Sequence, residues 1–252
     1  MVSFEHEFKR LERRILRLTN ICLFPKRIEV RGNENFVRTG PNLIVGNHIG
    51  SYKDVGTLLK TVPRPIYFVA NKMIFNREEA KALVTRHLNR HLKEFAFVVQ
   101  VLLKPFYAYA VPFVSDNIGR VGTIPVDMYG NRSDAIYKIQ DYLRAGRAVI
   151  ALQGRGRVLP RDPNPYVPHF RRGAAIMAYN LYRNEGLSVP VTPLSFFGTH
   201  ILWGVPNRIR VNVGPALSIK DFWGEGDSGV VERFRAALEK AVSRLFLDSL
   251  KW

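Results

Sequence analysis

The spacing of hydrophobic positions at the start of the chain is helical. Residues 4–24 carry basic side chains on the remaining sides, and their apolar positions are Phe4, Phe8, Leu11, Ile15, Leu18 and Cys22. This pattern predicts an amphipathic helix that ends before Pro25. Two interpretations stay open for it: a helix packed on the domain with a solvated face, or a helix lying in the headgroup region of an anionic bilayer.

Short apolar runs and helical patterns alternate through the rest of the chain. The runs predict strands at 27–31, 43–45, 66–70, 122–127, 147–152, 188–196 and 208–213. Helical patterns predict helices at 52–62, 77–94 and 132–145, one ending near residue 183, and a last one at 229–250. This alternation, in a chain of 252 residues, predicts one α/β domain with a sizeable core.

A histidine and a carboxylate follow the second predicted strand. Gly46-Asn47 predicts a turn, His48 comes next, and Asp54 lies at the start of the following helix. An imidazole at the end of a strand, with a carboxylate one turn further on, is typical of a general base and the group that orients it. Ser51 can also cap the helix, so the stretch has a purely structural interpretation as well.

The loop after the strand predicted at 147–152 reads Gln153-Gly154-Arg155-Gly156-Arg157. Permissive glycines beside two guanidinium groups suit the binding of a phosphate. The loop is neither a Walker A sequence nor a dinucleotide fingerprint. For Arg157, and for Arg171-Arg172, a solvated surface position is the favoured interpretation.

Residues 95–114 are rich in Phe, Tyr, Val and Leu but are interrupted by Lys104-Pro105 and Pro112. The stretch is too broken to span a bilayer by itself, so we expect a buried hairpin, the wall of a pocket or an interfacial membrane segment. His87 and His91 have the spacing of metal ligands. No third ligand is nearby, so they are interpreted as surface residues and no metal site is predicted.

The charge of the chain limits the classes of partner that we expect. The chain has 38 Lys and Arg against 21 Asp and Glu, a formal charge of +17, which favours nucleic acid, acidic lipid, an acidic carrier protein or phosphorylated substrates. The sequence has no helix-turn-helix, zinc-finger or RNP pattern, so nucleic acid is not expected.

The single cysteine, Cys22, cannot form an intramolecular disulfide and is consistent with a reducing, cytoplasmic setting. Neither a signal peptide nor an 18-residue apolar run is found.

Four stretches of the sequence resemble a known family when they are taken together. In order they are His48–Asp54, Gly122–Arg132, Gln153–Arg157 and Val189–Ser195. They resemble blocks one to four of the glycerolipid acyltransferases, of the bacterial 1-acylglycerol-3-phosphate acyltransferase type. Phe170-Arg171-Arg172-Gly173-Ala174-Ala175 matches the segment that follows block three in that family.

The resemblance implies a fold and an activity. The fold would be a single α/β domain over 27–252, with a mixed sheet flanked by helices, preceded by the N-terminal helix at 1–26. The stretch between blocks one and two is longer than in the family, and we interpret the extra length as a hydrophobic insertion at about 77–114. The activity would be transfer of an acyl group from acyl-coenzyme A or acyl carrier protein, as co-substrate, to a hydroxyl of a lysolipid. No other cofactor is expected. The basic charge leads us to expect binding to anionic lipids at the cytoplasmic face of a membrane, as a peripheral or monotopic protein.

The resemblance also implies roles for particular residues. His48 would be the base and Asp54 its orienting group, while Pro193 would shape the pocket. Acceptor binding would fall to five residues in blocks two and three, Arg132, Gln153, Gly154, Arg155 and Arg157.

Two blocks depart from the family pattern. Five residues separate His48 from Asp54, where the family has four, and we expect Gly50 to absorb the extra residue in a local bulge. Block three has Gln153 where the family has a glutamate. A non-catalytic, lipid-binding member of the family is therefore the alternative interpretation, with a basic nucleic-acid-binding protein the less favoured one.

Overall fold

The structure is a computed structural model that describes residues 3–92, 96–127, 130, 133–161, 163–224 and 229–252. It separates into two compact units, each described here by itself. Unit 1 comprises Met1–Glu12 and Tyr67–Ala135, and unit 2 comprises Arg13–Ile66 and Ile136–Trp252. Helix α1 (Phe4–Leu23) begins in unit 1 and continues into unit 2.

Unit 2 is built on a mixed sheet of five strands in the order β1-β7-β6-β2-β5. Only β6 and β7 are antiparallel, and the other neighbouring pairs are parallel. The strands are β1 (Arg27–Arg31), β2 (Asn42–His48), β5 (Ala148–Gly154), β6 (Val191–Phe197) and β7 (Arg208–Val213). The predicted α/β class, with a mixed sheet flanked by helices, is confirmed.

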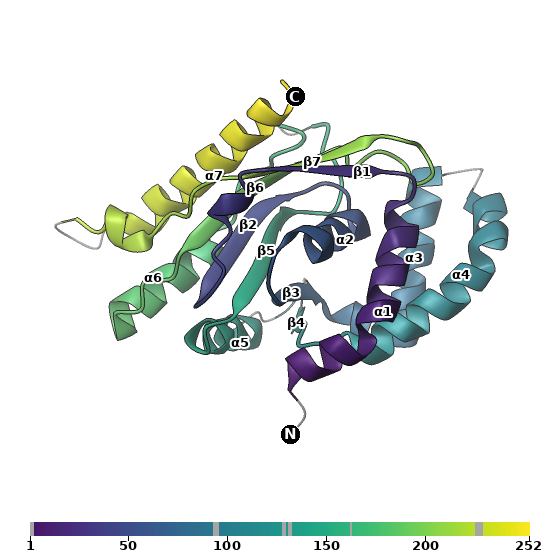
Figure 1. Ribbon diagram of the computed structural model, residues 1–252, viewed down its shortest axis with the longest axis horizontal. Coiled ribbons are helices and arrows are strands. Elements are labelled where there is room, and N and C mark those ends of the chain that lie inside the picture. The colour runs from purple at the N-terminus through teal and green to yellow at the C-terminus, as the bar shows by residue number, and fades with distance from the viewer. Residues whose placement is uncertain (1–2, 93–95, 128–129, 131–132, 162, 225–228) are drawn as a thin grey trace. The chain divides into compact units, whose positions relative to one another are not determined.

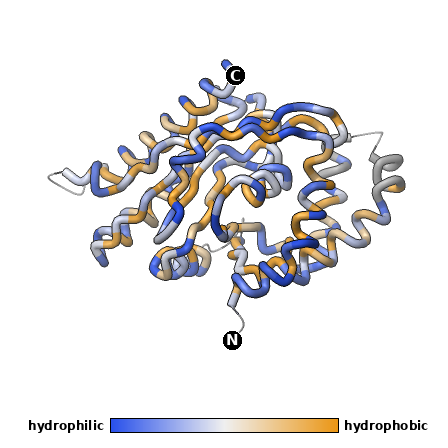
Figure 2. The backbone as a smooth tube through the Cα atoms, viewed as in Figure 1, coloured by the Kyte–Doolittle hydropathy of each residue, from blue (hydrophilic) through white to orange (hydrophobic). Residues whose placement is uncertain are grey.

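Helices cover both faces of this sheet. In Figure 1, α6 (Gly173–Glu185) and α7 (Val230–Ser249) lie together on one side, and α2 (Tyr52–Thr61) lies on the other. A further helix, α5 (Ser133–Arg144), precedes β5. Hydrophobic residues run along the central strands, whereas α7 alternates between hydrophilic and hydrophobic positions (Figure 2). The core of unit 2 therefore lies between the sheet and one face of each helix.

Strand β2 is longer than the sequence predicted, and the turn expected at Gly46-Asn47 was wrong. Every residue of β2 before His48 is buried. A Cβ atom at Gly46 would lie 2.6 Å from the carbonyl oxygen of Leu194, so glycine allows two strands to approach closely here. The Asn47 side chain accepts from the backbone N–H of Phe196 at 2.7 Å and donates to its carbonyl at 3.0 Å. Residues typical of turns thus serve to pair strands.

Unit 1 contains a parallel pair of strands and two long helices. The strands are β3 (Ile66–Asn71) and β4 (Ile124–Val126), and the helices are α3 (Arg77–Leu92) and α4 (Ala96–Asn117). Helices α3 and α4 contact each other, and Arg77 at the start of α3 pairs with Asp116 at the end of α4.

The hydrophobic stretch forms one helix from residue 96 onward, so a hairpin, one of the three interpretations of this stretch, was wrong. The wall of a pocket and the interfacial membrane segment stay predictions. Pro105 and Pro112 both lie inside α4. Each proline removes one N–H from the helix, but the helix continues across both positions. Among the described residues, no helix is both long and apolar enough to cross a bilayer. The predicted boundary at residue 26 and the predicted insertion at 77–114 stay predictions.

Candidate active site

The carboxyl ends of β2 and β5 lie side by side and bring blocks one and three together. In the parallel register, Asn47 is the partner of Gln153 and His48 is the partner of Gly154. The carboxyl ends of parallel strands are where open α/β sheets bind ligands. Two motifs separated by about a hundred residues of sequence therefore share one edge of the sheet.

His48 and Asp54 form a hydrogen-bonded pair at this edge. Nδ1 of His48 lies 2.8 Å from Oδ2 of Asp54. The Asp54 side chain is fully buried, whereas 26% of the His48 side chain is exposed. The expected contact is therefore present despite the longer spacing in the sequence.

Oδ2 of Asp54 also holds the backbone of the turn. It accepts from the N–H of Ile49 at 3.0 Å and from the N–H of Gly50 at 2.8 Å. Nδ1 of His48 donates to the same oxygen, which assigns the tautomer with its lone pair on Nε2. The imidazole is thus oriented to accept a proton at Nε2.

The unusual backbone between His48 and Asp54 lies at Ser51 and not at Gly50, where we expected a bulge. Ser51 has φ 54° and ψ −122°, which L-residues rarely adopt. Ser51 is the N-cap residue of α2, but its side chain makes no capping hydrogen bond, so the predicted side-chain cap was wrong. Gly50 is needed for a different reason: a Cβ atom there would lie 2.3 Å from Cβ of Thr199.

The Gly154–Gly156 loop packs against His48. A Cβ atom at Gly154 would lie 2.8 Å from the carbonyl oxygen of His48. A Cβ atom at Gly156 would lie 3.2 Å from Nε2 of the same histidine. Both glycines have positive φ, 129° and 70°. The loop thus approaches the imidazole to a distance that side chains would prevent.

The arginines of this loop are available to a ligand. Arg155 is exposed and Arg157 is half-buried. Within the described part of the chain, neither guanidinium has an ion-pair partner. Arg132, the other predicted acceptor-binding arginine, lies outside the described residues.

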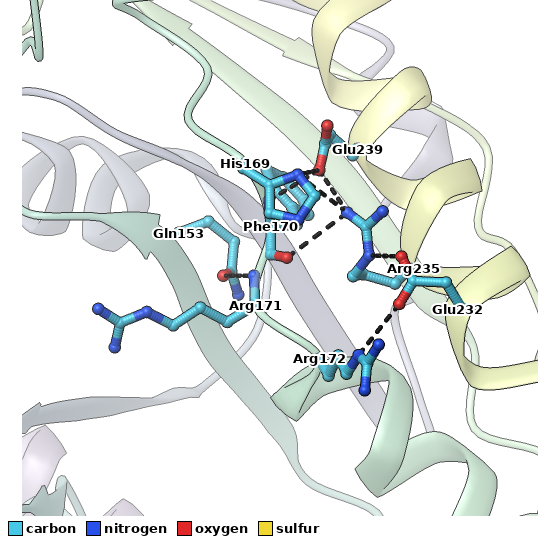
Figure 3. Close-up of polar contacts among 8 residues, drawn as sticks. All are labelled: Gln153, His169, Phe170, Arg171, Arg172, Glu232, Arg235 and Glu239. Carbon is cyan, nitrogen blue, oxygen red and sulfur yellow. Dashed lines mark hydrogen bonds and ion pairs between the residues drawn. The ribbon is translucent and has the colours of Figure 1, made fainter. Parts of the chain in front are cut away.

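Gln153 holds the segment before α6 instead of facing solvent. Its side chain is buried, and Oε1 accepts from the N–H of Arg171 at 3.1 Å (Figure 3). The neighbouring N–H of Phe170 donates to Oε2 of Glu239 at 2.8 Å. Two successive N–H groups are thus bound, one by β5 and one by α7.

A network of charged side chains on α7 supports the second of these contacts. Arg235 donates to Glu239 at 2.5 Å and to Glu232 at 2.6 Å, and Arg172 pairs with Glu232 at 3.1 Å (Figure 3). The side chain of Arg171 extends away from this network in the same view. Of the two neighbouring arginines, Arg172 therefore has a structural partner, whereas Arg171 is directed elsewhere.

Pro193 lies within β6, three positions before the level of His48. It is buried, and its register partner in β2 is Val45. The ladder with β7 begins at Leu194, so the missing N–H of Pro193 lies beyond the end of that ladder. Pro193 therefore lies within the sheet, three positions before the level at which His48 and Asp54 meet.

Sequence reasoning missed two lysines near the turn. Lys53 is buried, and burial is the main reason that its pKa falls to about 8. Its Nζ donates to the carbonyl of Ile201 at 2.6 Å. Lys26, whose pKa burial also lowers, binds the same loop. Lysine on an amphipathic helix is usually exposed, so the sequence held no signal for this role.

Comparison with known proteins supports the fold. No protein-family model matches the chain, and no curated protein matches it. Among solved structures, it is similar to the 1-acyl-sn-glycerophosphate (LPA) acyltransferase PlsC from Thermotoga maritima, with a TM-score of 0.60 and 19% sequence identity. The match covers 100% of this chain and 84% of that chain. The chain therefore has the fold of the PlsC acyltransferase.

Proposed function

We propose that this protein is an O-acyltransferase that moves a fatty acyl group from a thioester carrier to a hydroxyl of a lysophospholipid or related glycerolipid. The observation that carries the proposal is the pair of His48 and Asp54, with Nε2 of His48 facing a glycine loop that bears two arginines. The similarity of fold to PlsC supports the same chemistry.

The pair supplies what such a transfer needs. Nε2 of His48 removes the proton of the acceptor hydroxyl as its oxygen attacks the thioester carbonyl. Asp54 holds the ring through Nδ1 and stabilises the imidazolium that forms. When the tetrahedral intermediate collapses, the carbon–sulfur bond breaks, and the imidazolium returns its proton to the departing thiolate. The products are an ester and a free thiol, and the histidine is neutral again.

Acceptor binding falls to the arginines of the loop. Arg155 and Arg157 lack ion-pair partners in the described part of the chain, so they remain available for a headgroup phosphate. We propose the same role for Arg132, while Gly154 allows the loop to approach the base. The amide of Gln153 is buried and binds the N–H of Arg171, so we propose that its part in acceptor binding is to position this segment. Pro193 shapes the sheet beneath the site.

The charge of the chain fits the remaining partners. A formal charge of +17 favours association with an anionic membrane surface, worth about 1 kcal/mol for each well-placed Lys or Arg. The same charge attracts the phosphates of coenzyme A or an acidic acyl carrier protein, and either can be the donor. We propose peripheral binding at the cytoplasmic face.

A non-catalytic, lipid-binding role was the alternative suggested by the altered spacing of block one and by Gln153 in block three. The 2.8 Å contact between His48 and Asp54 argues against the first of these two reasons. Turnover is therefore the better-supported proposal.

The test is release of free thiol from acyl-coenzyme A and acyl carrier protein thioesters, with vesicles and a panel of lysolipid acceptors. We expect acceptor-dependent release that His48→Ala abolishes. His169→Ala is the matched control, because His169 also pairs with a carboxylate, Glu239, but 75% of its side chain is exposed. Vesicle binding without release from either donor, with any acceptor, would overturn the proposal in favour of a lipid-binding protein.

A further inference from the structure

Large apolar side chains are exposed on two segments of unit 2, the end of α1 and the loop between β6 and β7. Their exposed fractions are 39% for Ile21, 64% for Phe24, 59% for Leu202, 39% for Trp203 and 44% for Val205. We call these five residues the loop patch. A single exposed apolar residue is ordinary, whereas a group of them marks a surface that contacts a partner or a membrane.

A hydrogen bond joins the two segments of the loop patch. The indole N–H of Trp203 donates to the carbonyl of Ile21 at 2.7 Å. This contact satisfies the one polar atom of the tryptophan side chain and a carbonyl in the last turn of α1. Two segments far apart in the sequence therefore present one surface.

Three carbonyls of the loop are bound by two lysines. Nζ of Lys26 donates to the carbonyls of Leu202 at 3.0 Å and Val205 at 3.1 Å, and Nζ of Lys53 donates to that of Ile201 at 2.6 Å. An unsatisfied carbonyl in hydrocarbon costs several kcal/mol, roughly, and this cost normally keeps irregular loops out of lipid. Here the carbonyls of Ile201, Leu202 and Val205 are already bound, which lowers the cost of bringing the loop to the acyl boundary.

Basic residues adjoin the loop patch. Arg13, Arg14 and Arg17 are exposed on α1, and Arg27 is exposed just after it. An apolar surface next to exposed arginines fits the boundary between the headgroups and acyl chains of an anionic bilayer.

The loop is also attached to the turn that holds the catalytic pair. Thr199 packs against Gly50, and Lys53 lies in the same turn as Asp54. A surface that inserts through Leu202 and Trp203 would therefore hold His48 near the headgroup layer.

We propose that the loop patch inserts into anionic bilayers. This inference deepens the proposed function, because it names the surface through which the site reaches a lipid acceptor. The insertion itself requires no turnover.

The test is co-sedimentation with vesicles of equal parts phosphatidylcholine and phosphatidylglycerol, without acyl donor. We expect Phe24→Ser with Leu202→Ser to weaken binding by about tenfold for each side chain removed. Tyr137→Ser is the matched control: its side chain on α5 is 64% exposed, as is that of Phe24. Binding of the double variant equal to that of the native protein would overturn the proposal.

A second measurement keeps the test independent of folding defects. Trp223→Phe with Trp252→Phe leaves Trp203 as the single tryptophan of the chain, which has three. We expect vesicles with brominated acyl chains to quench its fluorescence. Unquenched Trp203 on vesicle-bound protein would overturn membrane insertion. So would light scattering in which substitution of the loop patch changes the oligomeric state of the protein.

The two proposals fail separately. His48→Ala should bind vesicles as the native protein does, although it releases no thiol. Thiol release that persists while Trp203 stays unquenched would support the proposed acyl transfer and contradict insertion of the loop patch. Insertion of the loop patch without thiol release from any thioester would support insertion and contradict the proposed acyl transfer.

Discussion

Gly156 lies against Nε2 of His48: a Cβ atom at residue 156 would be 3.2 Å from that nitrogen. In the proposed transfer this nitrogen meets the acceptor hydroxyl, so the space beside it must stay free of protein atoms. The glycine therefore serves the site as well as the backbone, which at this residue has φ 70°.

Gly156→Ala should thus lower turnover more than it lowers stability. The matched control is Gly186→Ala, because Gly186 has φ 66° but no atom within 4 Å of the added Cβ. Both variants should lose about 1–2 kcal/mol of unfolding free energy from the left-handed backbone. Only Gly156→Ala should lose thioester turnover, by about tenfold or more. Urea titration and thiol release measure the two effects, and equal turnover in the two variants would contradict the assignment.

Asp54→Asn and Asp54→Ala should separate orientation of the base from support of the turn. Asparagine retains an oxygen that can accept from Ile49 and Gly50 but no longer stabilises the imidazolium, so turnover should fall by about a hundredfold with stability nearly kept. Alanine leaves both buried N–H groups unsatisfied, at about 1–3 kcal/mol for each. Thiol release and urea titration on both variants test this. Full activity in Asp54→Asn would show that the carboxylate does not act through His48.

Gln153→Ala should lower the unfolding free energy by about 1 kcal/mol, because the N–H of Arg171 loses its acceptor. Gln153→Glu keeps an oxygen at that position and should recover most of the loss. Thermal unfolding of the two variants compares them directly. If Gln153→Ala keeps native stability but weakens binding of the lysolipid acceptor, Gln153 faces the headgroup after all.

Lys53 should make stability depend on pH. Burial lowers its pKa from 10.5 to about 8, so between these values the unfolded chain holds a proton that the folded chain has released. The unfolding free energy should therefore rise with pH across this window, and Lys53→Met should remove that rise.

The comparison of Lys53→Met with the parent protein should be made in a Cys22→Ala background. Burial raises the pKa of the Cys22 thiol to about 11, so the folded chain keeps a proton that the unfolded chain releases, and stability falls over an overlapping range. Parallel stability curves with and without the Lys53→Met substitution would contradict the prediction.

The periodicity of the sequence predicted most elements because each one has a buried side. β1 and β7 have the predicted bounds. The ends of α2 and α7 lie within one residue of the ends predicted for these two helices. Predictions failed where a residue type has two uses. Gly46 and Asn47 favour a turn by propensity, yet contacts across the sheet with Leu194 and Phe196 keep them in a strand.

The proximity of the candidate site residues could be predicted from the sequence, but the contacts that support them could not. His48, Asp54 and the glycine loop follow strands that end at one edge, and the sequence shows this order. The conformation of Ser51 and the contact of Gly50 with Thr199 depend on how distant segments meet, which no local pattern encodes.

The unusual backbone of Ser51 changes how a motif of this kind should be searched for. A fixed count of residues between histidine and aspartate describes the length of the chain that connects them. Proton transfer depends only on the positions of the two side chains in space. Here the longer stretch contains one residue in a rarely occupied conformation, and the 2.8 Å contact is still made. A search that permits one insertion at this point would recover sequences that a rigid pattern passes over.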